Sequence, residues 1–234
     1  RDDIVLTAAP LFHIGGLNVM TIGSFHTGSC VVLLRGFDAG LALKNIEQYR
    51  VTHMFGAPAM FLFMSQQPQF ADTGLSPIKT LICAAAPVPE SLIELYGARG
   101  VPFCQGYGLT ETSPFSAFLT PEFGISKLGS AGQPPLFSDT RIVDNDNREL
   151  PPGERGEICL RGPNIMKGYW NRPDATAAAI DAEGWFHSGD VGYVDEDGFL
   201  FICDRLKDMV ISGGENVYPA EVESVLYRHE HVAE

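Results

Sequence analysis

The stretch CQGYGLTETSP, residues 104–114, combines two glycines with an aromatic ring, a hydroxyl and a carboxylate. Tyr107 can stack on a base, Thr110 can donate to a phosphate, and Glu111 offers the hard oxygen ligand that Mg²⁺ prefers. Glu111 stands where a dinucleotide fingerprint has its third glycine, and the P-loop lysine is absent, so neither of those phosphate loops fits. The alternative is a plain strand-to-helix turn built on the two glycines and capped by Thr110, and composition alone slightly favours it.

A second group of candidates lies downstream. Asp190 is flanked by Gly189 and Gly192, so its carboxylate can approach a ligand closely, and such an acceptor suits ribose hydroxyls. An Asx-turn carboxylate that satisfies its own backbone is an equally common reading. Arg205 follows an expected strand and suits phosphate or ribose, or else a surface ion pair. The glycines of segment 212–214 suit either a channel lining or a tight turn.

The composition excludes some classes of function. The net charge of −13 over 234 residues argues against nucleic-acid binding, which needs a basic surface. The five cysteines are scattered without a CxxC pair, which favours a reducing cytoplasm over a disulfide framework or a zinc cluster. No apolar run reaches the length of a transmembrane helix.

The first half of the chain reads as an α/β layer, because apolar runs alternate with amphipathic stretches. Buried strands are expected at 4–11, 29–34 and 79–87, and helices at 40–50, 57–68 and 89–100. The apolar stretch 54–64 fits either an apolar substrate pocket or the core.

From about residue 121 the texture changes to short strands between turn signals, which predicts a small antiparallel sheet or barrel. The expected elements are strands at 140–144, 156–162 and 198–205 and a helix at 173–180. After Asp204 the pattern reads strand, glycine turn, and a helix from about Pro219.

Taken in order, PLFHIGGL (10–17), AAAP (84–87), QGYGLTET (105–112) and the long stretch 184–223 closely resemble the adenylate-forming, AMP-binding superfamily. That superfamily holds acyl-CoA synthetases, luciferases and peptide-synthetase adenylation domains. The resemblance spans essentially the whole chain. The segment ENVYPAEVE (215–223) is closer to acyl-CoA ligases than to peptide-synthetase domains.

The resemblance implies a fold of three parts. Residues 1–120 are expected to form part of the α/β subdomain of the large AMP-binding domain, and 121–204 a small β-rich, barrel-like subdomain. Residues 205–234 are expected to hold the hinge and the beginning of the mobile α+β C-terminal domain, with Lys207 as the pivot.

The resemblance also implies roles for individual residues. Tyr107 packs on adenine, Thr110 contacts the α-phosphate, and Glu111 binds Mg²⁺. Asp190 holds the ribose hydroxyls with help from Arg205. The full set expected to bind ATP or AMP is Ala85, Ala86, Gln105, Gly106, Tyr107, Thr110, Asp190, Ile202 and Arg205.

The acyl and coenzyme A groups are expected to meet His13, Ala84, Gly108, Gly213 and Gly214. In the resembled family His13 lies by the acyl carboxylate and, with Thr110 and Glu111, completes the expected catalytic set. As a lone histidine it is more often a packed or turn residue. The methyl group of Ala84, where many family members have glycine, either narrows the pocket or is a neutral packing change.

The implied activity joins a carboxylic acid to ATP, releases pyrophosphate, and passes the acyl group to coenzyme A with Mg²⁺ as cofactor. Neither the family's SGTTGxPKG-like phosphate loop nor its C-terminal GK lysine occurs in these 234 residues. The sequence therefore predicts a piece of a longer synthetase, inactive by itself. The alternatives are another adenylate-forming enzyme or a non-catalytic binding protein.

Overall fold

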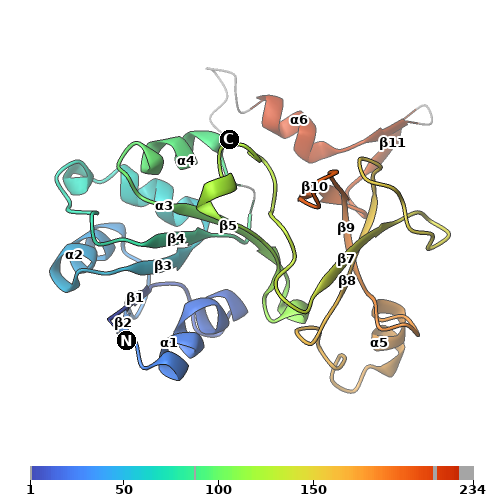
Figure 1. Ribbon diagram of the computed structural model, residues 1–234, viewed down its shortest axis with the longest axis horizontal. Coiled ribbons are helices and arrows are strands. Elements are labelled where there is room, and N and C mark those ends of the chain that lie inside the picture. The colour runs from blue at the N-terminus through green and yellow to red at the C-terminus, as the bar shows by residue number, and fades with distance from the viewer. Residues whose placement is uncertain (1, 87, 213–214, 227–234) are drawn as a thin grey trace. The chain divides into compact units, whose positions relative to one another are not determined.

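The structure is a computed structural model that describes residues 2–86, 88–212 and 215–226. The chain divides into two compact units, unit 1 over residues 1–135 and unit 2 over residues 136–234. Each unit is described by itself. Figure 1 labels their elements along the chain. Among the described residues, no helix is long and apolar enough to cross a membrane.

Unit 1 is built on a six-stranded sheet of order β2-β1-β3-β4-β5-β6. The first five strands in this order run parallel, and β6 pairs antiparallel with β5. The strands are β1 (Ile4–Thr7), β2 (Cys30–Leu33), β3 (His53–Gly56), β4 (Thr80–Cys83), β5 (Phe103–Gly108) and β6 (Phe115–Leu119). The helical segments are η1 (Gly15–Thr21), α1 (Ile22–Thr27), α2 (Ala39–Tyr49), α3 (Pro58–Ser65), η2 (Pro68–Phe70), α4 (Glu90–Gly97), η3 (Thr110–Thr112) and η4 (Pro121–Phe123).

Local sequence explains where these helices begin. The Asp38 carboxylate accepts from the Leu41 backbone N–H at 2.6 Å and so caps α2. Pro58 starts α3, at a position where a missing N–H costs nothing.

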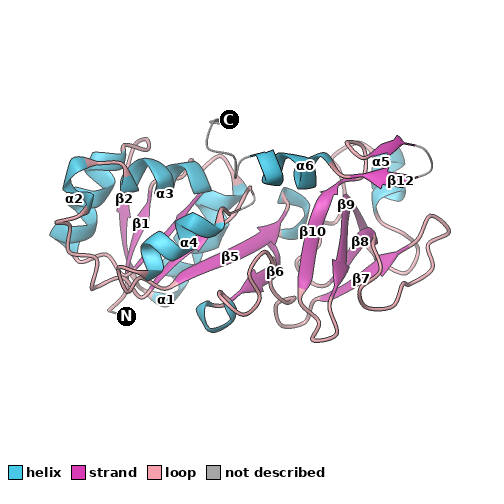
Figure 2. Ribbon diagram, turned by 90° about the horizontal axis from the view of Figure 1, so that it is seen from above, coloured by secondary structure: helices cyan, strands magenta, loops and turns pink. Residues whose placement is uncertain are grey.

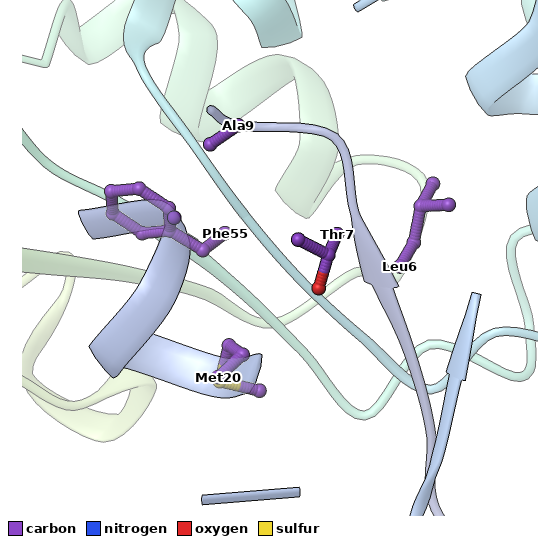
Figure 3. A pocket seen from close by; sticks show the side chains of 6 residues that line it. Leu6, Thr7, Ala9, Met20 and Phe55 are labelled. Atoms are coloured by element: carbon purple, nitrogen blue, oxygen red, sulfur yellow. The ribbon is translucent and has the colours of Figure 1, made fainter. Parts of the chain in front are cut away.

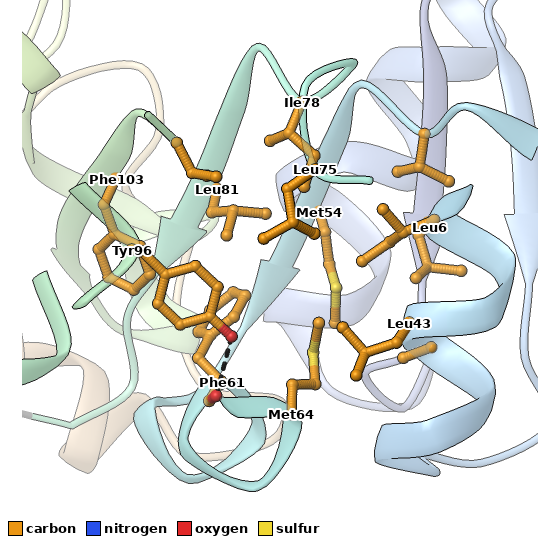
Figure 4. Packing of buried hydrophobic residues seen from close by; sticks show 14 of the residues in the cluster. Leu6, Leu43, Met54, Phe61, Met64, Leu75, Ile78, Leu81, Tyr96 and Phe103 are labelled. Carbon is orange, nitrogen blue, oxygen red and sulfur yellow. Dashed lines mark hydrogen bonds between the residues drawn. The ribbon is translucent and has the colours of Figure 1, made fainter. Parts of the chain in front are cut away.

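Helices cover both faces of the unit 1 sheet, as Figure 1 shows. On one face, α2, α3 and α4 pack on strand residues such as Leu6, Met54 and Leu81. Figure 4 shows this cluster, in which the buried Tyr96 hydroxyl donates to the Phe61 carbonyl at 2.9 Å. On the other face, η1 packs on alternate strand residues, including Phe55. This alternation follows from the two-residue period of a strand.

Unit 2 contains a four-stranded antiparallel sheet of order β10-β9-β8-β7, seen in Figure 2. Its elements are β7 (Asp139–Val143), β8 (Gly156–Arg161), α5 (Pro173–Ala179), β9 (Phe186–Val194) and β10 (Leu200–Arg205). The β11 (Val210–Ser212) and β12 (Glu215–Val217) hairpin and α6 (Pro219–Leu226) follow.

The predicted fold class is confirmed: an α/β layer precedes a small antiparallel sheet and the start of an α+β segment. The expected helices at 40–50, 57–68, 89–100 and 173–180 all form, and α3 ends at Ser65, earlier than expected. The strand expected over 4–11 ends at Thr7, ahead of Pro10. The helical pair η1 and α1 was not predicted.

Candidate functional site

The candidate residues of unit 1 lie at or beyond the carboxyl ends of parallel strands. Segment 84–86 follows β4, and β4 pairs with β5 in a register that puts Cys83 beside Gln105. Segment 105–111 therefore lies next to segment 84–86 in the sheet. His13 lies between β1 and η1, beyond the carboxyl end of β1. In open α/β sheets, ligands bind outside these strand ends.

Segment 104–114 runs from β5 through one helical turn towards β6, so the predicted strand-to-helix turn forms, but the predicted cap at Thr110 is wrong. Tyr107 lies within β5, and the single helical turn η3 leads straight into β6. The turn is closed by Thr112 and not by Thr110: the Thr112 hydroxyl accepts from Leu109 N–H at 2.9 Å and donates to the Pro114 carbonyl at 2.6 Å.

The two glycines of this segment are required by strand packing. A Cβ on Gly108 would lie 1.6 Å from the Pro114 carbonyl oxygen, and one on Gly106 would lie 2.4 Å from the Phe115 ring. The pairing of β5 with β6 is irregular between Tyr107 and Gly108, which brings the two backbones together at that point.

Because Thr112 closes the turn, the Thr110 hydroxyl is left exposed, and the neighbouring Glu111 is half-buried. Glu111 offers carboxylate oxygens, the type of ligand that Mg²⁺ prefers, and the Thr110 hydroxyl remains available to a phosphate. The donor set therefore fits the magnesium site that the sequence predicts.

A small, narrow pocket lies between η1 and the adjacent strands β1 and β3. His13 is exposed, and its Nδ1 accepts from Gly15 N–H at 3.1 Å. The pocket lies where the strand order reverses direction, since β2 lies on one side of β1 and β3 on the other. Figure 3 shows the side chains that line it: Leu6, Thr7, Ala9, Gly16, Met20 and Phe55.

The backbone of η1 approaches the loop after β1 very closely. A Cβ on Gly16 would lie 2.2 Å from the Pro10 carbonyl oxygen, and the Thr21 hydroxyl donates to the Gly16 carbonyl at 2.8 Å. Sequence reasoning missed the pocket and η1 together. The glycine pair that follows His13 was the available signal for a close backbone approach.

The two alanines after β4 differ in environment. Ala84 is 6% exposed and packs with Phe55 and Ile82, so its methyl group belongs to the core. Ala85 is exposed and has a φ of +76°, which disfavours a residue with a Cβ. Ala86 is exposed beside it.

In unit 2, Asp190 and Arg205 are paired across β9 and β10. The Asp190 residue is 8% exposed and its Oδ1 lies 3.8 Å from Arg205 Nε, whereas the Arg205 side chain is 63% exposed. Ile202 and Lys207 are exposed. Gly213 and Gly214 lie outside the described residues.

A polar cluster on β8 and β9 was not predicted. Glu157 Oε2 lies 2.8 Å from His187 Nδ1, and Cys159 Sγ lies 3.4 Å from the same nitrogen. Burial, helped by the Glu157 carboxylate, raises the pKa of the Cys159 thiol to about 12. The alternation of Glu157 and Cys159 along one strand face was a usable signal, but it needs the partner strand to become a cluster.

Asp181 and Arg141 flank this cluster. Asp181 Oδ2 lies 3.8 Å from His187 Nε2 and 3.1 Å from an Arg141 guanidinium nitrogen. Although burial opposes it, hydrogen bonds from the Trp185 and Glu183 backbone N–H groups lower the pKa of the Asp181 carboxyl below its ordinary value.

Comparison with known proteins gives consistent matches. The family model of the AMP-binding enzyme matches residues 1–170. Feruloyl-CoA synthase from Amycolatopsis sp is 48% identical over 97% of this chain and 46% of its own length. A 2-succinylbenzoate–CoA ligase from Geobacillus sp. (strain WCH70) is 45% identical over 100% of this chain and 47% of its own.

Among solved structures, o-succinylbenzoate coenzyme A synthetase from Bacillus subtilis, in complex with ATP and magnesium ion, matches with a TM-score of 0.91 and 40% identity. The match covers 99% of this chain and 48% of that one. The chain thus spans about half the length of the curated relatives it matches.

Proposed function

The chain belongs to the AMP-binding enzyme family, and from that premise we propose that the full-length protein is an AMP-forming acyl-CoA synthetase. It adenylates a carboxylic acid with ATP and releases pyrophosphate. The thiol of coenzyme A then attacks the acyl carbon, and AMP leaves. The proposal is supported by relatives named as CoA ligases at 45–48% identity.

The observation that carries the proposal is that segments 84–86 and 105–111 lie next to each other at the carboxyl ends of the parallel strands β4 and β5. In this proposal Tyr107 packs on adenine while the backbone of the neighbouring segments, including Gln105, Gly106, Ala85 and Ala86, borders it. Thr110 donates to the α-phosphate. Glu111 holds Mg²⁺, which offsets the phosphate charge when bound.

The acyl carboxylate is assigned to the side of His13, beyond the carboxyl end of β1. His13 faces the acyl carboxylate in this proposal, while Ala84 and Gly108 border the acyl and coenzyme A path.

Unit 2 supplies the groups for ribose and for the second step. Asp190 accepts hydrogen bonds from the ribose hydroxyls, beside Arg205 and Ile202. Lys207 is the pivot on which the C-terminal domain turns between the two half-reactions, and Gly213 with Gly214 borders the pantetheine arm. We assign the protein to the cytoplasm on its scattered cysteines.

The substrate class is proposed from the relatives. Ferulic acid and 2-succinylbenzoic acid both carry an aromatic ring, so aryl acids are tested first, with fatty acids in the same panel.

The full-length protein is incubated with ATP, Mg²⁺ and each acid, and pyrophosphate, AMP and thioester are measured. Acid-dependent pyrophosphate release followed by a CoA thioester is the expected result. Adenylation without a thioester for any acid refutes the ligase and points to another adenylate-forming class. No adenylation at all points to a binding protein.

Glu111→Ala tests the metal role, with Glu122→Ala as a matched control because Glu122 is exposed in the same unit. We expect Glu111→Ala to slow Mg²⁺-dependent adenylation by roughly 100-fold or more with little change in melting temperature. The reason is that the variant no longer holds the Mg²⁺ ion that offsets negative charge on the phosphates in the transition state. Equal rates in the two variants remove Glu111 from the metal role.

A further inference from the structure

The segment Ser188–Asp190 is a bulge in the antiparallel pairing of β8 with β9. Glu157 pairs with Val191 and Cys159 pairs with His187, so three residues of β9 stand opposite Ile158 alone. A bulge leaves backbone groups without ladder partners, and side chains must satisfy them. The candidate ribose acceptor, Asp190, belongs to this bulge.

Side chains supply the missing hydrogen bonds. Glu157 Oε1 accepts from Gly189 N–H at 3.0 Å. The Ser188 hydroxyl donates to the Ile158 carbonyl at 2.7 Å and accepts from Asp190 N–H at 3.0 Å. On the other side of the bulge, the Gly189 carbonyl accepts from Leu206 N–H at 2.8 Å, next to Arg205.

Glu157 is itself held in place. Its second oxygen lies 2.8 Å from His187 Nδ1, and Asp181 lies 3.8 Å from the other ring nitrogen. The side chains of Glu157, His187 and Asp181 are 20%, 23% and 19% exposed, so water competes only partly with these contacts. The carboxylate therefore has one oxygen for the imidazole and one for the bulge. Figure 2 shows β8 and β9 side by side in the sheet that carries these residues.

We propose that Glu157 is a positioning residue for the nucleotide: by holding Gly189 it fixes the bulge that presents Asp190 to ribose. This rests on the proposed function, in which Asp190 binds ribose. A charge-assisted hydrogen bond from a carboxylate is stronger than a neutral one, which suits a carboxylate for holding an irregular backbone.

A metal is the competing occupant of the same place. Glu157, Cys159 and His187 offer ligand atoms that lie within 4.8 Å of one another. Two observations favour the hydrogen-bonded arrangement. Glu157 and His187 are already at hydrogen-bond distance, and the Arg141 guanidinium next to Asp181 adds a positive charge that a cation would have to approach.

The test compares Glu157→Ala and Glu157→Gln with Glu154→Ala, whose side chain is exposed in the turn before β8. The first readout is hydrogen exchange of the Gly189 amide in chain 1–234 without nucleotide. The second is kcat and KM for ATP and for the acid in the full-length enzyme.

For Glu157→Ala we expect about 10-fold faster Gly189 exchange and an ATP KM raised about 10-fold, with the KM for the acid unchanged. Glu157→Gln should recover part of both effects, because its amide oxygen still accepts from Gly189 N–H. Glu154→Ala should match the wild type. If Glu157 only stabilised the fold, Glu157→Ala would change the KM for ATP and the KM for the acid alike, and Glu157→Gln would not restore the KM for ATP selectively.

Several results overturn the proposal. Unchanged Gly189 exchange in Glu157→Ala, in an enzyme that adenylates normally, refutes the positioning role alone. Stoichiometric zinc in the purified protein, lost in Glu157→Ala, assigns the cluster to a metal. A wild-type enzyme without adenylation activity refutes the proposed function, and with it the nucleotide role of Glu157.

Discussion

Replacing Gly108 by alanine tests whether strand packing or ligand contact requires the glycine. The ideal Cβ lies 1.6 Å from the Pro114 carbonyl oxygen, whereas ordinary contact begins at 3.4 Å. The obstacle is backbone, so no side-chain rotation relieves it. The end of the β5–β6 pairing, where Gly108 stands opposite Phe115, must therefore move.

The expected loss of stability follows from two opposing effects. Overpacking of this kind costs about 1–3 kcal/mol, and removing a glycine from the unfolded chain returns about 0.4–1 kcal/mol. The difference is about 0–2.6 kcal/mol, and because the obstacle is backbone we expect Gly108→Ala to lower the free energy of unfolding by an amount in the upper half of that range. The control is Gly97→Ala in α4, where nothing lies within 4 Å of the added Cβ. Its helix should gain up to about 1 kcal/mol.

The measurement is urea unfolding of chain 1–234, followed by far-ultraviolet circular dichroism. Tryptophan fluorescence is unsuitable, because Trp170 and Trp185 both lie in unit 2 and report poorly on β5 and β6. A Gly108→Ala midpoint equal to or above that of Gly97→Ala would refute the packing explanation. The glycine would then be free for a ligand-based role.

Three further predictions concern stability and reactivity. Ala85→Gly should be about 1 kcal/mol less destabilising than Ala84→Gly in urea unfolding, because only Ala85 has a positive φ and only Ala84 loses a buried methyl group. Asp181→Asn should lower the melting temperature at pH 7 more than at pH 3. The reason is that the pKa of the Asp181 carboxyl in the folded chain lies below the ordinary value of 3.8. The ionised carboxylate therefore stabilises the fold above pH 3.8, and this stabilisation is lost as the pH falls from 3.8 through the folded pKa. Iodoacetamide should label Cys30 first in the native chain, because Cys30 is exposed whereas burial raises the pKa of the Cys159 thiol to about 12. Mass spectrometry before and after unfolding identifies the labelled cysteines, and early labelling of Cys159 contradicts the prediction.

The elements of the chain were predictable because local periodicity and end signals agree with the fold. The helix expected at 40–50 has the Asp38 cap and an apolar face that packs into the core. The strands of unit 2 were predictable from the turn signals between them. The segment after His13 was not, because a π-helix whose glycine touches the Pro10 carbonyl has no local pattern of its own.

The family resemblance identified the candidate residues but not the neighbouring residues that hold them in place. Thr110 and Thr112 are both threonines in one short turn, and only the paired strand shows that Thr112 closes it. For Glu157 the sequence predicted only a place in the strand expected at 156–162. Its partner at Gly189 is 32 residues away, and such contacts depend on how β8 and β9 align.

Three strand pairings that carry proposed nucleotide residues are irregular at or near those residues, whereas the pairing of β4 with β5 at Gln105 is regular. The shift between β5 and β6 falls at Tyr107 and Gly108, that between β8 and β9 includes Asp190, and that between β9 and β10 falls between Ile202 and Asp204, ahead of Arg205. A bulge turns a side chain away from the alternation of a regular strand and frees backbone groups. Side chains then accept hydrogen bonds from the freed backbone N–H groups, as Thr112 does beside η3 and Glu157 does at Gly189. If the proposed nucleotide residues bind ATP, the residues that hold each bulge act on the same site, and variants of the two kinds should share a raised KM for ATP.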